Sequence, residues 1–177
     1  LRIEDPALAR SIRPGQFVMI RPGSEGADDP LLGRPFALYD VVFDPSGTPT
    51  AIDVVYLVIG RGTRALAQRK AGERLAVWGP LGNGFGPAPD GPVIFVAGGI
   101  GQTPFLALGR WWLGQIRMSE GDDALAARSS AATLLYGVRS ADLLAGVDDF
   151  RQAGIEVEVA TDDGSAGHHG FVTALLR

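Results

Sequence analysis

Two groups of residues in this sequence have the types and spacing expected of nucleotide sites. In the first, Arg34 offers a fork of donors matched to a phosphate, and Phe36 offers an aromatic face for a ring system. Gly62 and Thr63 offer backbone amides at a helix start, where an anion is stabilised. Taken singly, Arg34 would be interpreted as a surface ion-pair partner and Phe36 as a core residue. Together the four residues suit a flavin dinucleotide.

The second group is a glycine-rich turn between a strand and a helix, Gly98 to Pro104. Gly99 and Gly101 lack the Cβ that would block a pyrophosphate, Thr103 suits a helix N-cap, and Pro104 suits the first helical position. Such a turn also arises wherever a chain must reverse tightly, and Pro104 replaces the third glycine of the usual dinucleotide fingerprint. The first group favours the nucleotide interpretation of the second.

The elements that must position these residues divide into two halves, and the length of 177 residues suits two small domains. The first domain, residues 1–90, has short β-rich runs separated by Gly and Pro, which predict an antiparallel β-barrel. Its expected strands are Gln16 to Arg21, Pro35 to Phe43, Ile52 to Ile59 and Arg74 to Trp78. One helix is expected over Thr63 to Lys70, with Thr63 as its cap.

The second domain, residues 91–177, follows a Pro-rich linker over residues 87–92. Strand-like and helix-like segments alternate in it, which predicts a Rossmann-like parallel α/β sheet. The expected strands are Val93 to Ala97, Thr133 to Val138 and Ile155 to Ala160, with helices over Phe105 to Ile116 and Ala141 to Ala145. Residues 119–130 are expected to form a helix end and a loop.

Composition excludes several classes of protein. A net charge of -4 gives no field for a polyanion, so we expect no nucleic-acid partner. The apolar runs Val54 to Ile59 and Val93 to Gly98 fall far short of the roughly 20 residues that span a bilayer, so we expect no membrane segment. The absence of cysteine excludes disulfides and thiolate metal sites in this chain, and it favours a cytoplasmic protein. The strand-like start at Leu1 and the abrupt end at Arg177 lead us to expect a trimmed chain.

Four other side chains are weaker candidates. His168 and His169 are adjacent, so they point to opposite faces of an extended segment and are expected to be loop residues rather than metal ligands. Asp162 and Asp163 are either paired carboxylates for acid–base work or part of an ordinary Asp-Gly turn.

Two further residues follow the second strand of the α/β half, where selectors of a cofactor's 2'-substituent often lie. Arg139 would suit a 2'-phosphate and Asp142 a free ribose. The choice between NAD and NADP therefore stays open on the residues alone.

The sequence resembles the ferredoxin-reductase-like flavoproteins, and within them the electron transfer subunits of dihydroorotate dehydrogenase. The resemblance extends over nearly the whole chain, and its last run is the most discriminating. The runs that carry it are Pro14 to Val18, Gly33 to Ala37, Gly60 to Thr63, Gly79 to Phe85, Gly98 to Pro104, Leu135 to Ser140 and Thr161 to Ser165.

This resemblance implies an N-terminal FAD-binding barrel and a C-terminal NAD-binding half. Electrons would pass between NAD, FAD, a [2Fe-2S] cluster and the flavin (FMN) of a dihydroorotate dehydrogenase catalytic subunit, in a hetero-oligomer of pyrimidine biosynthesis. No side-chain acid or base is implied, because hydride transfer is the chemistry of the cofactors. The implied FAD contacts are Arg34, Pro35, Phe36, Ala37, Val55, Tyr56, Leu57, Gly62 and Thr63, and the implied NAD contacts are Gly98, Gly99, Gly101, Thr103, Pro104, Asp162 and Asp163.

The chain departs from the family in two ways. Ala37 stands where relatives often carry a hydroxyl residue near the reactive nitrogen of the flavin. The cysteines with which relatives hold the cluster follow the stretch equivalent to Arg177, so the cluster segment is expected from the family but absent from this chain.

Three functions remain open at this stage. The first is the electron transfer subunit of an NAD-dependent dihydroorotate dehydrogenase. The second is the FAD- and NAD(P)-binding subunit of a ferredoxin:NADP oxidoreductase or a related complex. The third is a nucleotide-binding regulatory module without redox activity.

Overall fold

The structure is a computed structural model, and it describes residues 1–23, 32–118 and 129–176. The chain separates into two compact units, Leu1–Gly84 and Phe85–Arg177. No helix among the described residues is long and apolar enough to cross a membrane.

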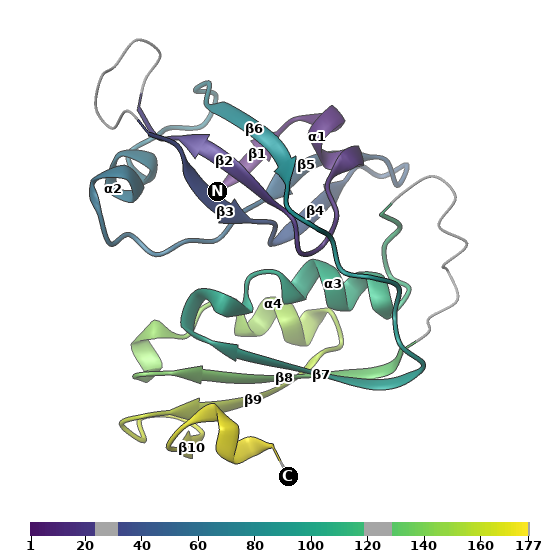
Figure 1. Cartoon of the computed structure of the whole chain (residues 1–177), viewed down its shortest axis with the longest axis vertical. Coiled ribbons are helices and arrows are strands. Elements are labelled where there is room, and N and C mark those ends of the chain that lie inside the picture. Colours follow the sequence, from purple (N-terminus) through teal and green to yellow (C-terminus); the bar gives the residue numbers. More distant parts are fainter. Residues whose placement is uncertain (24–31, 119–128, 177) are drawn as a thin grey trace. The chain divides into compact units, whose positions relative to one another are not determined.

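The first unit is built from antiparallel strands, as the sequence predicts (Figure 1). One sheet has the order β1-β5-β4 and the other the order β3-β2-β6. The strands are β1 (Arg2–Glu4), β2 (Phe17–Arg21), β3 (Arg34–Ala37), β4 (Asp40–Phe43), β5 (Pro49–Asp53) and β6 (Ala76–Leu81). Among the described residues the antiparallel strands of the predicted barrel form two open sheets.

The chain changes sheet between Leu38 and Tyr39. The amide of Leu38 donates to the carbonyl O of Gln16 at 3.1 Å, and the amide of Tyr39 donates to the carbonyl O of Asp53 at 2.9 Å. Neighbouring residues therefore bond to different sheets, and the single strand expected over Pro35 to Phe43 is two strands. The strand expected over Ile52 to Ile59 is also wrong, because β5 ends at Asp53.

Helix α1 (Pro6–Ser11) closes one side of the core of the first unit. Its N-cap is Asp5, whose Oδ1 accepts hydrogen bonds from the amides of Ala7 and Leu8 at 3.0 Å each. The helix packs on β5 and buries Leu8 and Ala9. The core itself comes from alternate residues of the strands, which point to one face: Val18, Ile20, Phe36, Val41 and Ile52.

Helix α2 (Arg61–Ala67) begins earlier than the sequence predicts. Gly60 is its N-cap, and Thr63 lies in the third helical position rather than at the cap. The Thr63 Oγ1 accepts from the amides of Ile59 and Gly60 at 3.1 Å each, which pairs donors that a helix start would otherwise leave unpaired.

The second unit is the parallel α/β sheet that the sequence predicts. Its strands lie in the order β10-β9-β8-β7, and all three pairings are parallel. They are β7 (Gly91–Gly98), β8 (Ser129–Val138), β9 (Glu156–Thr161) and β10 (His168–His169). The prediction that His168 and His169 lie in a loop is wrong, because these two residues form β10 and pair with β9. Most of the loop expected over 119–130 lies outside the described residues.

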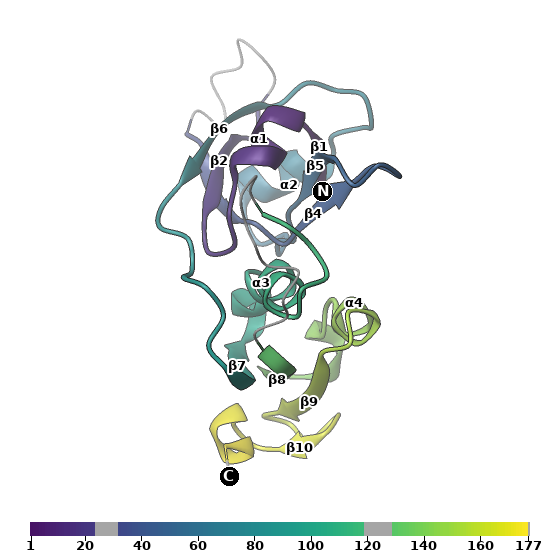
Figure 2. The same ribbon diagram turned by 90° about the vertical axis from the view of Figure 1, so that its right-hand side faces the viewer.

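Short helices cover this sheet. They are η1 (Gly99–Gln102), α3 (Phe105–Trp112), η2 (Ala141–Leu143), α4 (Val147–Gln152) and η3 (Val172–Leu175). Helices α3 and α4 lie on one face and η3 on the other (Figures 1 and 2).

Four aromatic rings fix the segment that enters β7. Phe95 stacks on Phe105 at 4.9 Å and on Trp112 at 5.8 Å, and Phe85 contacts the latter two rings. The indole Nε1 of Trp112 also donates to the carbonyl O of Gly86 at 3.2 Å. These contacts attach residues 85 and 86 to the second unit.

Candidate functional site

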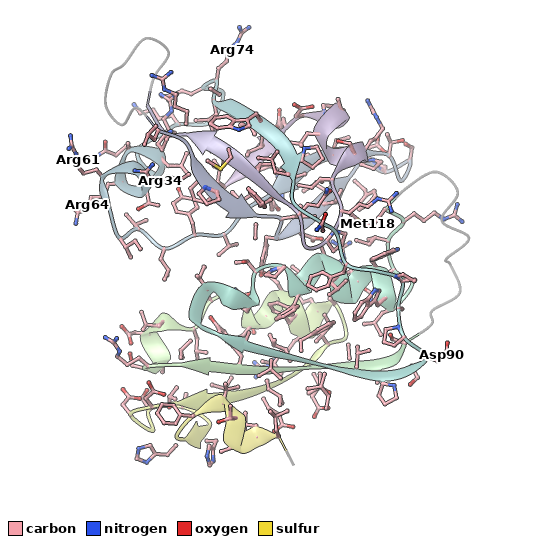
Figure 3. All side chains as sticks on the ribbon, viewed as in Figure 1. Arg34, Arg61, Arg64, Arg74, Asp90 and Met118 are labelled. Atoms are coloured by element: carbon pink, nitrogen blue, oxygen red, sulfur yellow. The ribbon has the colours of Figure 1, made fainter. Side chains whose placement is uncertain are left out.

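In the first unit, Arg34 lies beside α2 (Figure 3). A Cβ added at Gly62 would lie 3.6 Å from Arg34 Cγ and 3.7 Å from Arg34 Nε, so the side chain runs along the first turn of the helix. Arg34 Nη1 donates to the carbonyl O atoms of Leu32 and Gly33 at 3.2 Å each. Because a guanidinium carries five N–H donors, an exposed Arg34 anchored in this way still has donors for an anion.

The start of α2 contributes amides rather than a hydroxyl. The Thr63 Oγ1 is engaged with Ile59 and Gly60, and it also donates to the carbonyl O of Gly60 at 3.2 Å. The backbone N–H groups of the first turn are the donors that this helix start offers, and Gly62 brings them next to Arg34 without a side chain.

The aromatic surface near β3 comes from Tyr56, one of the predicted flavin contacts, rather than from Phe36. Phe36 is buried, and its ring meets that of Tyr56 edge to face at 5.4 Å. Tyr56 is half-buried, and this burial raises the pKa of its hydroxyl. Leu57 is exposed beside it. The segment after β5 therefore presents the apolar surface, and Phe36 supports it from the core.

One aromatic residue near this site was missed at the level of sequence. Trp78 in β6 is 47% exposed, and its ring lies against Gly33. The only signal was a tryptophan in a short strand, and strand pairing had to be known before it could be placed beside Gly33.

In the second unit, the glycine turn follows β7 directly. Gly99 has a φ of +54°, which favours glycine. A Cβ at Gly99 or Gly101 would meet no described atom within 4 Å. The turn therefore leaves open space where side chains would otherwise stand.

The assignment of Thr103 as N-cap is wrong. Residues 99–102 form a 3-10 turn, α3 begins only at Phe105, and Pro104 occupies its N-cap. The Thr103 hydroxyl donates to the carbonyl O of Ile100 at 3.0 Å, and Thr103 is buried. Its side chain thus holds the turn from inside.

Gln102 anchors the same turn to the segment before α4. It is fully buried, and its Nε2 donates to the carbonyl O of Ala145 at 3.4 Å. The backbone of Ala145 also forms a hydrogen bond with the hydroxyl of Tyr136. Burial raises the pKa of this hydroxyl, and the hydrogen bond lowers it in part. Buried side chains therefore hold the turn in place, while Gly99 and Gly101 border open space.

Asp163 is engaged within its own loop. Its Oδ1 accepts from Ser165 Oγ at 2.5 Å and from the amide of Ser165 at 2.9 Å. These bonds hold the pKa of the Asp163 carboxyl below its usual value. Ser165 Oγ in turn accepts from the amide of Ala141 at 2.8 Å, which connects the loops after β8 and β9. Asp162 is exposed next to it.

Arg139 and Asp142, the two residues expected to select the 2'-substituent of the cofactor, follow β8. Ser140 Oγ donates to a carboxylate oxygen of Asp142, so that acid is held close to the backbone. Arg139 offers its carbonyl O to the amide of Asp163 at 3.2 Å.

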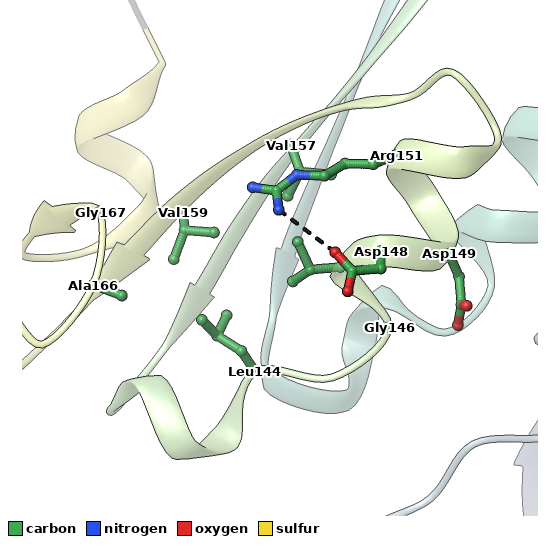
Figure 4. A pocket seen from close by; sticks show the side chains of 10 residues that line it. Leu144, Gly146, Asp148, Asp149, Arg151, Val157, Val159, Ala166 and Gly167 are labelled. Atoms are coloured by element: carbon green, nitrogen blue, oxygen red, sulfur yellow. Dashed lines mark ion pairs between the residues drawn. The ribbon is translucent and has the colours of Figure 1, made fainter.

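A cavity of about 730 Å³ lies beside β9, between α4 and residues 166–167 (Figure 4). Val157 and Val159 line it, as do Arg151 and Asp148 of α4, which pair with each other at 3.6 Å. Both charged side chains are largely exposed, so this pair contributes little to stability. None of the residues predicted to bind a nucleotide lines this cavity.

Several known proteins are similar to this chain over most of its length. No family model matches the chain. The dihydroorotate dehydrogenase B (NAD(+)) electron transfer subunit of Desulforamulus reducens is 35% identical, aligned over 100% of this chain and 61% of that protein. That of Clostridium acetobutylicum is 31% identical over 92% of this chain and 56% of its own length. A solved NADH-dependent reduced ferredoxin-NADP oxidoreductase matches with a TM-score of 0.71 and 30% identity, over 99% of this chain and 55% of the other.

The chain is similar along its length to ferredoxin-reductase-like proteins that bind FAD and NAD. It spans less than two thirds of the length of each of these relatives. The flavohem-like FAD/NAD-binding domain of a Vibrio cholerae nitric oxide dioxygenase, at 23% identity and a TM-score of 0.64, shares the fold.

Each of the two candidate sites brings together groups that can approach an anion. Arg34 and the first turn of α2 lie together, which gives a cation and amides for a pyrophosphate. In the second unit, the glycine turn, residues 139–142 and residues 162–165 follow the carboxyl ends of β7, β8 and β9. Ligands of open parallel sheets bind at these ends.

Proposed function

We propose that the chain binds FAD in its first unit and NAD(H) in its second, and that it is the electron transfer subunit of an NAD-dependent dihydroorotate dehydrogenase in pyrimidine biosynthesis. The observation that carries the proposal is the 35% identity, along the whole chain, to a protein of that name. A cytoplasmic location, expected from the sequence, is part of the proposal.

The FAD site would use two sets of residues. Arg34 and the amides of Gly62 and Thr63 would hold the pyrophosphate. The isoalloxazine would lie along β3 and the segment after β5, against Pro35, Ala37, Val55, Tyr56 and Leu57, with the buried Phe36 supporting Tyr56 from the core. Ala37 carries no hydroxyl, so a hydrogen bond to the flavin at this position would come from the backbone.

The NAD site would lie at the glycine turn. Gly98, Gly99 and Gly101 would allow the pyrophosphate to approach the backbone, while Thr103 and Pro104 shape the turn. Asp162, which is exposed, is the better partner for a ribose hydroxyl, because the Asp163 carboxylate is already bonded to Ser165.

When bound, FAD supplies the hydride and electron chemistry. The contribution of the chain is to bind and orient: Arg34 offsets phosphate charge, α2 presents amides, and the glycine turn admits the nicotinamide dinucleotide. No side-chain acid or base is required at either site.

The partner would be the FMN-containing catalytic subunit of a dihydroorotate dehydrogenase, in a hetero-oligomer. A [2Fe-2S] cluster is expected between the two flavins from the family. This chain has no cysteine, so it offers no thiolate to such a cluster.

The second candidate is a subunit of a ferredoxin:NADP oxidoreductase. Its support is the 30% identity to the NADH-dependent reduced ferredoxin-NADP oxidoreductase. Arg139 would then meet a 2'-phosphate, whereas Asp142 and Asp162 favour a free ribose.

The test is electron transfer with purified partners. The FAD-loaded protein is mixed either with a dihydroorotate dehydrogenase catalytic subunit or with a ferredoxin, and NADH or NADPH is supplied. We expect complex formation with the catalytic subunit and a preference for NADH. Binding to ferredoxin alone, and not to the catalytic subunit, would support the second candidate. A protein without a flavin absorption spectrum would support the regulatory module.

A further inference from the structure

Gln102 has a buried side chain whose hydrogen bonding is incomplete. Its exposed fraction is 0%, and its Nε2 donates to the carbonyl O of Ala145 at 3.4 Å, which is long for a hydrogen bond. Its Oε1 is also buried and accepts no hydrogen bond from the described residues. An unpaired buried oxygen costs free energy. Stability of the fold therefore gives little reason for an amide at this position.

The hydrogen bond of Gln102 joins the loops that follow two neighbouring strands. Gln102 ends η1, the glycine turn after β7, whereas Ala145 follows η2 in the segment after β8. Strands β7 and β8 pair in parallel, with Gly98 opposite Gly137, so both loops leave the same edge of the sheet. The side chain thus connects two loops that border the proposed NAD site.

The segment that Gln102 contacts is a tight turn. The amides of Leu143 and Leu144 each donate at 3.1 Å to the carbonyl O three residues earlier. Residues 139–142, which carry the two candidates for contact with the ribose 2'-substituent, lead into this turn. Because the turn is held by its own backbone bonds, the position of Ala145 helps to set that of residues 139–142.

A dinucleotide would need both loops at once. In the proposed NAD site the pyrophosphate lies at Gly99 and Gly101, and the adenosine ribose lies at the loop after β8. The spacing of the two loops then decides whether both ends of the ligand are held in place. Gln102 links the loops while its own side chain is fully buried, so it would act on the ligand without touching it.

We propose that Gln102 is a positioning residue, which fixes the spacing between the glycine turn and the loop after β8 and thereby favours dinucleotides over mononucleotides. This inference rests on the proposed NAD site. The affinity for a ligand that occupies both loops depends on Gln102. The affinity for a ligand that occupies only the glycine turn does not.

Gln115 provides a matched control in the same unit. Its Nε2 also donates to a backbone carbonyl O, that of Ala153, at 2.7 Å. Gln115 follows α3, and Ala153 follows α4 and precedes β9. A helix between parallel strands returns the chain to their amino ends, so this bond lies at the opposite edge of the sheet from both loops. Gln115→Met therefore removes a bond of the same kind without changing the spacing of the loops.

Calorimetric titration with ADP-ribose tests the inference without flavin or hydride transfer, since ADP-ribose carries the pyrophosphate and the adenosine of NAD. Gln102→Met removes the amide and keeps a side chain of similar length. It should raise the ADP-ribose dissociation constant about fivefold, the effect of one orienting hydrogen bond. The constant of Gln115→Met should stay within about twofold of that of the unsubstituted chain.

Stopped-flow reduction of bound FAD then compares NADH with reduced nicotinamide mononucleotide, which lacks the adenosine half. In Gln102→Met the dissociation constant for NADH should rise about fivefold, whereas its limiting rate and the constant for the mononucleotide should each stay within about twofold. Gln102→Asn has an amide one methylene short of Ala145. It should behave like Gln102→Met, and it serves in place of that variant if the methionine prevents folding.

An ADP-ribose constant that is unchanged in both Gln102 variants would overturn the inference and leave the proposed function standing. Equal losses for NADH and the mononucleotide would also overturn it, because the glycine turn itself would then have changed. If the unsubstituted chain binds no ADP-ribose, the proposed NAD site fails together with the inference.

Discussion

Gly62 and Gly101 both serve a candidate phosphate site, but their surroundings differ. A Cβ at Gly62 would touch Pro22 and Arg34, at 3.4 to 3.7 Å, whereas one at Gly101 would meet no described atom within 4 Å. The site in the first unit is thus lined by the protein's own side chains. The site in the second unit is backbone facing open space, above a buried Gln102 and Thr103.

A glycine can therefore be required at a ligand site for two different reasons. Where a neighbour already stands close, a substitution changes both the protein and its ligand site. Where the space is open, the folded protein tolerates a side chain and only an incoming ligand does not. A glycine substitution in the second unit therefore tests ligand binding separately from folding. A glycine substitution in the first unit affects both folding and binding.

The largest effect is expected from Gly101→Val. The branched side chain would occupy the open side of the turn, and NADH-dependent reduction of bound FAD should slow at least about 100-fold, the scale of a displaced reactant. Flavin content should be unchanged, because Gly101 lies in the other unit. Stopped-flow reduction by NADH, beside reduction by dithionite, measures the effect.

Gly137→Val is the contrasting control in the same unit. A Cβ there would lie 2.7 Å from Val172 Cβ, so this variant should lower the melting temperature, whereas Gly101→Val should not. A similar thermal destabilisation of both variants would remove the distinction between open and occupied glycines.

Arg34→Ala should have the next largest effect. It removes a charge-assisted contact worth about 1.5 to 3 kcal/mol, so the FAD dissociation constant should rise more than tenfold. Equilibrium dialysis followed by measurement of retained flavin tests this. Undiminished flavin content after extensive dialysis would count against the site.

Thr63→Ala should have a smaller effect on the same site. The Thr63 hydroxyl accepts from the amides of Ile59 and Gly60, and its loss should cost about 1 kcal/mol and weaken FAD binding about fivefold. Thr63→Ser preserves the hydroxyl and should bind FAD as the original chain does. If the serine variant is as weak as the alanine variant, the hydroxyl is not the cause.

The smallest effect concerns Asp163. Its pKa is lowered in the folded chain by bonds from Ser165, so the loop gains stability above the unfolded value of about 3.9 and loses it as the pH falls through the lowered folded value. The protection factors of the Ser165 and Ala141 amides, in which the intrinsic pH dependence of amide exchange is divided out, should therefore fall in acid. Asp163→Asn should already show low protection factors at neutral pH, and protection factors that do not change with pH in the original chain would contradict the assignment.

The fold class was accessible from sequence because it depends on periodicity. The continuous apolar run of β7 and the alternation of strands and helices after it are local signals, and the structure confirms them. The wrong predictions concern features that depend on contacts between residues distant in the sequence. The break at Leu38 and Tyr39 depends on pairing with Gln16 and Asp53, which no local pattern displays.

The same distinction applies to the candidate sites. Arg34 and the glycines could be selected by residue type, since donors and missing side chains are visible in the sequence. The inward turn of Thr103, the capture of Asp163 by Ser165 and the contact of Trp78 with Gly33 could not. Each of these depends on a loop conformation or on strand register rather than on composition.

The measurement that bears most directly on the central claim is flavin retention followed by reduction. The purified chain is incubated with excess FAD and desalted, and its visible spectrum is recorded before and after addition of NADH under exclusion of oxygen. The two-site account predicts equimolar FAD and bleaching of its absorption by NADH. A chain that retains no flavin, or retains flavin that NADH leaves oxidised, would contradict it.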